Sequence, residues 1–113
     1  MPATIVVVHD QPESLGEITE GLRSAGYDVA AFLDPLAAIA ALERARVLIT
    51  RVRFARGRPH GIALAQMAQV RRPGIKLVFT ALPEYELEAK ALGEFLPLPI
   101  RMPELLETVD RLI

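Results

Sequence analysis

Residues 45–51 of the chain read Ala-Arg-Val-Leu-Ile-Thr-Arg, and this stretch decides the fold that the sequence predicts. Its centre is a run of aliphatic and β-branched residues without a polar face, which is typical of a parallel strand covered on both sides. The run ends at a charged residue, Arg51, and a segment rich in Arg, Gly and Pro follows. We therefore expect a buried strand over residues 47–52 that leads into a functional loop.

Short apolar runs and amphipathic segments alternate along the rest of the chain. The predicted strands are 3–8, 27–32, 47–52, 75–80 and 94–97, and the predicted helices are 12–25, 35–42, 61–70, 83–92 and 102–113. This alternation implies βαβ crossovers. It predicts a single doubly wound α/β fold, with a five-stranded parallel sheet and five helices.

Local signals place the ends of these helices. Pro12 suits a first helical position, and Gly26 suits the residue just after a helix end. Asp34 precedes Pro35 and is expected to cap the second helix. The apolar residues of that helix predict an inward stripe of Leu36, Ile39, Ala40 and Leu42.

Length and composition limit the class of protein. A chain of 113 residues suits one compact domain, 1–113, with 51% hydrophobic and 24% charged residues as in globular proteins. No apolar run approaches the ~20 residues of a membrane span, and the first residues do not resemble a secretory signal. The absence of cysteine excludes disulfides and thiolate metal sites and fits a cytoplasmic protein.

Charge is strongly segregated along the chain despite a net charge of −1. Residues 1–43 carry seven acids and one base, residues 44–83 carry nine bases and no acid, and residues 84–113 carry seven acids and three bases. A charge run is usually a solvated surface. The alternative is a basic face over residues 44–76 that attracts nucleic acid or another anionic ligand.

Polar side chains follow several of the predicted strands. In a doubly wound fold, ligands bind beyond the carboxyl ends of the strands. The residues expected at such ends are His9, Asp10, Arg51, Arg53, Thr80 and Leu98. We expect these residues to converge on one site.

Five short motifs occur in order at consistent spacing. Beside the strand that ends at Arg51, they are Val-Val-His-Asp-Gln-Pro at 7–12, Pro-His-Gly at 59–61, the segment 71–81, and Phe-Leu-Pro-Leu-Pro-Ile at 95–100. Together they resemble the response-regulator receiver domain of bacterial two-component signalling, over essentially the whole chain. The resemblance implies the roles of individual residues.

Some positions keep the pattern of the family and others depart from it. Asp10 corresponds to an acid that helps to hold Mg²⁺, and Thr80 and Phe95 correspond to switch residues. Three positions are substituted: His9 replaces the first acid, Arg51 the phosphoacceptor aspartate, and Leu98 the active-site lysine. The Leu98-Pro99 bond corresponds to a bond that is cis in the family, and we expect it to be cis here.

These departures remove the chemistry of phosphotransfer. That chemistry needs a carboxylate nucleophile, a divalent cation held by carboxylates, and a lysine that neutralises the phosphoryl oxygens. An arginine beside the remaining carboxylate repels a cation. We therefore expect no catalysis and no cofactor, and we expect Arg51 to pair directly with Asp10; the alternative is that Arg51 receives an anion.

Other readings of the site are weaker. His9 and His60 could join Asp10 around a transition metal, but their spacing matches no short metal motif. Thr80 could be a nucleophile, but no base and orienting acid accompany it in a recognisable pattern. We expect no metal site.

Two classes of function fit the sequence. The first is a non-phosphorylatable receiver-like domain that works as a protein-interaction module, with a histidine kinase, a phosphotransferase, an output protein or a second copy as partner. Its interface is expected on the last two helices and the strand between them, which carry Glu86 and Glu88. The alternative is nucleic-acid or anionic-ligand binding through residues 44–76, which is less favoured because Phe54 is the one aromatic residue in the basic loop.

Overall fold

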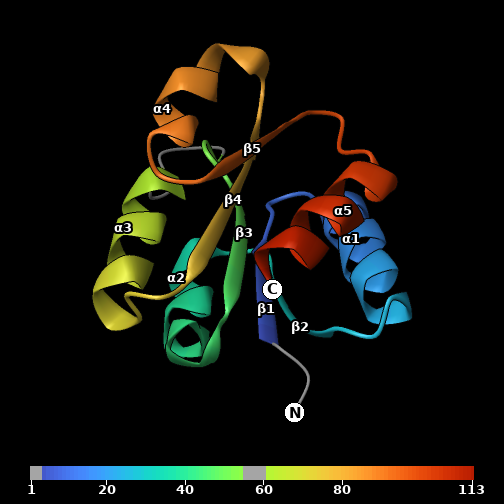
Figure 1. Cartoon of the computed structure of the whole chain (residues 1–113), viewed down its shortest axis with the longest axis horizontal. Helices are drawn as coiled ribbons and strands as arrows, with labels where there is room; N and C mark the ends of the chain where they lie inside the picture. Colours follow the sequence, from blue (N-terminus) through green and yellow to red (C-terminus); the bar gives the residue numbers. More distant parts are fainter. Residues whose placement is uncertain (1–3, 55–60) are drawn as a thin grey trace.

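The computed structural model describes residues 4–54 and 61–113 and contains a central sheet with helices on both faces (Figure 1). The strands are β1 (Thr4–Val8), β2 (Asp28–Phe32), β3 (Val47–Arg51), β4 (Lys76–Ala81) and β5 (Glu94–Pro97). The α-helices are α1 (Pro12–Ser24), α2 (Pro35–Ala38), α3 (Gly61–Arg71), α4 (Glu86–Lys90) and α5 (Met102–Leu112). Two 3₁₀ segments adjoin them, η1 (Ile39–Arg44) after α2 and η2 (Pro83–Tyr85) before α4.

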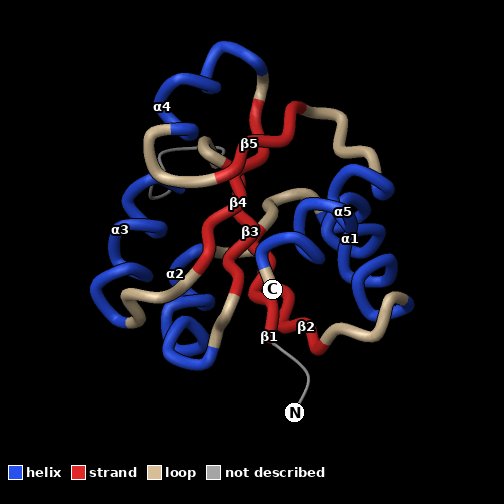
Figure 2. The backbone as a smooth tube through the Cα atoms, viewed as in Figure 1, coloured by secondary structure: helices blue, strands red, loops and turns tan. Residues whose placement is uncertain are grey.

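The five strands form one parallel sheet in the order β2-β1-β3-β4-β5 (Figure 2). The order reverses between β1 and β3, which is the switch point where doubly wound folds bind ligands. In the register of the sheet, Val8 lies opposite Thr50, and Arg51 lies opposite Thr80. The predicted doubly wound α/β fold with five helices is confirmed.

Two hydrophobic clusters fill the two faces of the sheet. Successive residues of β1 alternate between them: Val6 and Val8 belong to the cluster beneath α2, α3 and α4, whereas Ile5 and Val7 belong to the cluster beneath α1 and α5. A strand that is apolar on both faces is what burial under helices on both sides requires. The sheet is therefore the middle layer of three.

The helix ends follow the predicted signals in most cases. The carboxylate of Asp34 accepts a hydrogen bond of 2.9 Å from the backbone nitrogen of Leu36 and caps α2. Gly26 has a φ of 96°, a conformation that glycine adopts without the steric cost of a side chain. The buried stripe of α1 includes Leu15, Ile18 and Leu22.

The inward stripe predicted for the second helix is wrong at two positions. Leu36 is 58% exposed and Ala40 is exposed, while the small residues Pro35 and Ala38 face the sheet. The helix also continues as η1, whose 3₁₀ geometry has three residues per turn rather than 3.6. The periodicity of an ideal α-helix therefore does not apply across this segment, although Leu42 is buried as predicted.

The fourth predicted helix, 83–92, is shorter than expected. It begins with η2 and continues as α4 over only Glu86–Lys90. No helix among the described residues has the length and apolar content needed to cross a membrane.

Candidate functional site

The carboxyl ends of β1 and β3 bring Asp10 and Arg51 together. A guanidinium nitrogen of Arg51 (NH1) lies 2.9 Å from a carboxylate oxygen of Asp10 (Oδ1), which is a charge-assisted hydrogen bond. The two side chains are 21% and 20% exposed, respectively. This is the direct ion pair that the sequence predicted.

The backbone of Arg51 contacts the start of α3, and its guanidinium is bonded to Asp10. Its Nε is buried and has no hydrogen-bond partner among the described residues. The first residue of α3, Gly61, packs against its backbone, and a side chain at Gly61 would collide with the carbonyl oxygen of Arg51. The backbone nitrogen of Gly61 donates a 2.8 Å hydrogen bond to Val52, so the start of α3 is fixed to the end of β3.

His9 lies directly before Asp10 and is almost completely buried, with 2% of its surface exposed. Its Nδ1 accepts a 3.1 Å hydrogen bond from the backbone nitrogen of Gln11, which places the imidazole proton on Nε2. Desolvation by burial lowers the pKa of His9; the charge of nearby Arg51 lowers it further, and Asp10 opposes this shift. His9 is therefore neutral near pH 7.

The lowered pKa of His9 predicts a pH dependence of stability. Unfolded His9 titrates near its ordinary pKa of about 6.5, whereas folded His9 resists protonation, so the unfolded chain binds more protons below that pH. Its contribution to stability is complete above about pH 6.5 and decreases as the pH falls toward the lower folded pKa. Thermal melts should show a smaller loss of Tm between about pH 7.5 and 5.5 in His9→Asn than in the wild type. His60→Asn is the control, and an unchanged loss in His9→Asn would contradict the assignment.

Thr80 and Phe95 occupy different environments. Thr80 is 1% exposed and lies opposite Arg51 in the sheet, so it lies at the same end of the sheet as the ion pair. Phe95, on β5, lies opposite Phe79 of β4. It is half-buried and packs against the core cluster beneath α2, α3 and α4. The structure therefore brings Thr80 to the site, whereas Phe95 packs half-buried against the core cluster.

Leu98 lies just beyond β5, where its backbone nitrogen donates a 2.9 Å hydrogen bond to Ala81. The Leu98-Pro99 bond is cis, as predicted. Leu98 and His9 line one hollow of about 340 Å³ between the start of α1 and the loop after β5. The hollow is lined by His9, Gln11, Ser14, Glu17, Ile18, Leu82, Leu98, Pro99, Ile100 and Met102.

This hollow contains residues that the sequence did not single out. Leu82, which is 51% exposed, and Ile100 come from loops after different strands, and Glu17 comes from α1. No local motif marks them, because their proximity depends on how the fold places α1 beside the loops that follow β4 and β5. Leu82, Leu98, Pro99 and Ile100 make one side of the hollow apolar.

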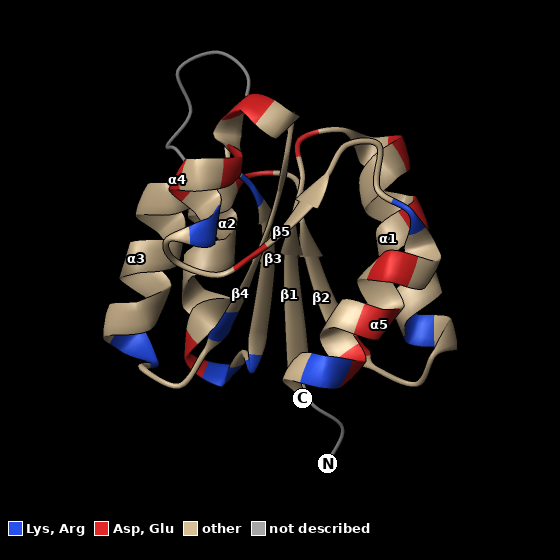
Figure 3. Cartoon of the chain, turned by 45° about the horizontal axis from the view of Figure 1, so that its top comes forward, with Lys and Arg blue, Asp and Glu red and all other residues tan. Residues whose placement is uncertain are grey.

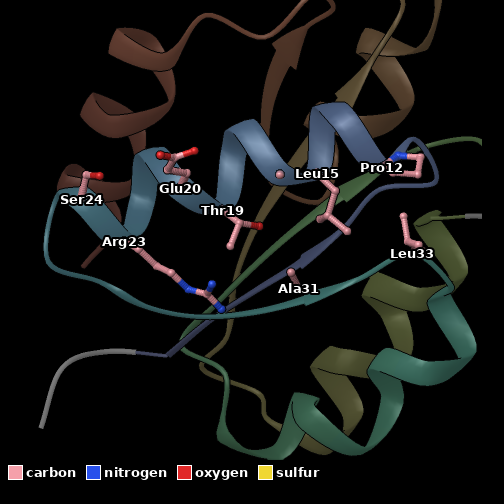
Figure 4. Close-up of a pocket in the computed structure, with 9 residues that line it drawn as sticks. Pro12, Leu15, Thr19, Glu20, Arg23, Ser24, Ala31 and Leu33 are labelled. Carbon is pink, nitrogen blue, oxygen red and sulfur yellow. The ribbon is translucent and has the colours of Figure 1, made fainter.

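A larger groove, of about 720 Å³, lies between α1 and the edge strand β2 (Figure 4). Its lining includes Leu15, Ala31 and Leu33, and the buried hydroxyl of Thr19 has no hydrogen-bond partner among the described residues. Arg23 also lines it and donates a 2.9 Å hydrogen bond to the carbonyl oxygen of Val29. None of the site residues predicted from the sequence lies in this groove.

The donors near Asp10 do not fit a divalent cation. Mg²⁺ requires several oxygen ligands, whereas Asp10 is paired with the guanidinium of Arg51 and lies 3.9 Å from the imidazole of His9. Across residues 4–54 and 61–113, no group of three His, Cys, Asp or Glu side chains is arranged to hold a metal ion. His60, considered with His9 as a metal ligand, lies outside the described residues.

Comparisons with known proteins agree with this fold. No protein-family model matches the chain, and no curated protein sequence matches it. Among solved structures, a response regulator receiver protein from Sinorhizobium medicae superposes with a TM-score of 0.86 at 23% identity, covering 98% of this chain and 94% of that one.

Two further solved structures are similar. The receiver domain of the hybrid histidine kinase CckA has a TM-score of 0.82 at 25% identity, with 97% of this chain and 98% of that one covered. An adenylate cyclase from Rhodopirellula baltica has a TM-score of 0.87 at 17% identity, with 100% and 88% covered. The chain therefore has the fold of response-regulator receiver domains.

Proposed function

We propose that this chain is a degenerate receiver-like domain of two-component signalling, which accepts no phosphoryl group and acts by binding another protein. The observation that carries the proposal is the 2.9 Å ion pair between Arg51 and Asp10 at the switch point of the sheet. Arg51 stands where the resemblance expects the phosphoacceptor, and its guanidinium engages the carboxylate that would otherwise bind a cation.

The pair also affects the conformation of the site. In a phosphorylatable receiver, a phosphoryl group adds negative charge at the acceptor residue. This charge changes the shape of the surface formed by the last strand and the last two helices. Here a fixed positive charge is already present and is paired within the fold. The domain therefore keeps one conformation. It acts by binding a partner, and this binding does not depend on phosphorylation.

The surface formed by α4, β5 and α5 is the proposed interface. Most of its charges are paired locally: Lys90 with Glu86 at 2.7 Å, Arg101 with Glu104 at 3.5 Å, and Arg111 with Glu94 at 2.7 Å. Glu88 has no such pair among the described residues, and Leu87 beside it is 89% exposed. An exposed leucine between acids suits a partner with an apolar contact and a basic rim. A histidine kinase, a phosphotransferase, an output protein or a second copy are the candidate partners.

Substitution of Leu87 tests this interface. Leu87→Asp is expected to weaken binding by about tenfold or more, because it places a charge at the centre of the contact. Val70→Asp is the matched control, since Val70 is an 83% exposed apolar residue on α3, outside the proposed surface. Sedimentation equilibrium would measure self-association. Binding to the surface-immobilised protein would measure its affinity for kinases and phosphotransferases encoded by the same genome.

A second variant separates charge from apolar contact. Double reversal, Glu86→Lys with Glu88→Lys, should weaken the same association and remove its dependence on salt, with little change in Tm. If the protein is monomeric at every concentration and both variants bind all candidate partners as the wild type does, the interface is wrong.

A further inference from the structure

A basic hollow lies at the amino ends of β3 and β4, at the opposite end of the strands from Arg51. We name it the amino-edge hollow; it measures about 470 Å³ and is lined by Arg46, Arg72, Gly74, Lys76, Leu112 and Ile113. In Figure 3, several Lys and Arg residues gather at this end of the molecule, near the starts of β3 and β4 and the ends of α3 and α5. None of the lining side chains is acidic.

The fold builds the basic side of the amino-edge hollow from three neighbouring elements: β3, β4 and α3. β3 and β4 are adjacent, and Lys76 lies opposite Val47. The backbone nitrogen of Lys76 donates a 2.9 Å hydrogen bond to the carbonyl oxygen of Arg46, which places Arg46, the residue just before β3, beside the start of β4. The third base, Arg72, follows the end of α3, where its backbone nitrogen bonds to Ala68 at 2.8 Å. The turn that includes Gly74 then returns the chain to β4 and brings Arg72 to the same hollow.

The charges of the amino-edge hollow are not neutralised by the fold. Among the described residues, the side chains of Arg46 and Lys76 form no hydrogen bond and no ion pair. Arg72 donates a 3.0 Å hydrogen bond to the backbone carbonyl of Glu43, which orients the guanidinium without cancelling its charge. Cations of like sign held together repel one another, and a bound anion relieves that repulsion.

One wall of the amino-edge hollow is apolar. Leu112 and Ile113 line it at the end of α5, and Ile113 is 42% exposed. A volume of this size lies in the range of small-molecule sites. A simple inorganic anion would use the cations and leave the apolar wall without contact.

We propose that the amino-edge hollow binds a small phosphorylated organic molecule, with its phosphates among Arg46, Arg72 and Lys76 and its organic part against Leu112 and Ile113. Arginine suits this task because its planar fork of donors matches phosphate oxygens. Single-stranded nucleic acid is a poorer fit, because the lining has no aromatic side chain on which a base could stack. The site lies at the far edge from Arg51 and does not depend on the proposed function.

Titration with ATP, pyrophosphate and inorganic phosphate tests the site. Isothermal titration calorimetry should detect ATP and pyrophosphate, with ATP the tighter ligand because it also contacts the apolar wall. Backbone amide NMR shifts should be confined to residues around Arg46, Gly74 and Lys76. Shifts centred instead on Arg51, or no binding of any of these probes by the wild type, would refute the site.

Charge reversal locates the binding. Arg46→Glu with Lys76→Glu should weaken ATP binding about tenfold or more, and both side chains are exposed, so folding should be retained. Arg53→Glu with Arg101→Glu is the matched control, because it makes the same change of charge at exposed positions away from the hollow. An equal loss in the control would show diffuse electrostatic attraction and would contradict a built site.

Two other ligands give distinct outcomes. Binding of duplex DNA more tightly than ATP at the same ionic strength would replace the proposal with a nucleic-acid surface. Concentration-dependent dimerisation that pyrophosphate abolishes would identify the occupant as acidic side chains of a second copy and would overturn the proposal. A short glycine tail appended to Ile113 moves any terminal carboxylate away from the cations, and ATP binding should persist or strengthen in that variant.

Discussion

Incubation with acetyl phosphate and Mg²⁺ is expected to leave the mass of this protein unchanged. The expected acceptor position holds Arg51, whose guanidinium is not a nucleophile and is bonded to Asp10 at 2.9 Å. The position at which the resemblance leads us to expect a neutralising lysine holds Leu98, which lines an apolar side of a hollow. Intact-protein mass spectrometry would measure the result, with a phosphorylatable receiver in the same tube as the positive control. Addition of one phosphoryl group, mapped near Asp10, would overturn the proposed function.

Restoring the acceptor alone should not restore the reaction. Arg51→Asp supplies a carboxylate and releases Asp10, but the developing charge on the phosphoryl oxygens remains uncompensated at Leu98. Loss of one such stabilising group costs roughly a hundredfold or more in rate. Arg51→Asp combined with Leu98→Lys and His9→Asp completes the acid and lysine set, and measurable phosphorylation is expected only there. Equal phosphorylation of the single and triple variants would show that Leu98 and His9 are not limiting.

The fold could be predicted from the sequence because the central strands β1 and β3 are apolar on both faces. Val47 to Ile49 leave no polar side to expose, and helices on both faces of a parallel sheet are the arrangement that buries such a run. The pairing of Arg51 with Asp10 followed from the same logic, since neighbouring parallel strands bring their carboxyl ends together.

Features that depend on packing were missed. The inward stripe predicted for α2 was wrong because the Asp34 cap and η1 fix the ends of the helix and so determine which residues face the sheet. Leu36 is apolar but exposed, and it therefore misled the prediction. The segment 44–76 was recognised as basic but not as two separate surfaces. Arg46 lies just before β3 and Arg51 is its last residue, so the two side chains lie at opposite ends of the strand. Arg56 and Arg58 of this segment lie outside the described residues.

Removal of the carboxylate of Asp10 is expected to destabilise the fold strongly. Asp10→Ala leaves the guanidinium of Arg51 near a largely buried strand end without its 2.9 Å partner, and its Nε already lacks one among the described residues. A charge-assisted hydrogen bond of this kind contributes about 2 kcal/mol, less than a fully buried pair because each side chain is about one fifth exposed. The expected decrease in Tm is roughly 10 °C for a domain of this size.

A double-mutant cycle separates the ion pair from the loss of Asp10 itself, which has further interactions besides Arg51. Arg51→Met removes the charge but keeps most of the side-chain volume, and it should cost less than Asp10→Ala. The double variant should be more stable than Asp10→Ala alone, because no unpaired charge then remains at the strand end. Excess Mg²⁺ should leave the wild-type Tm unchanged, since a ligand stabilises a protein only where the folded state binds it. Additive losses of stability in the cycle, or an increase in Tm with Mg²⁺, would mean that Arg51 does not occupy the place of the cation.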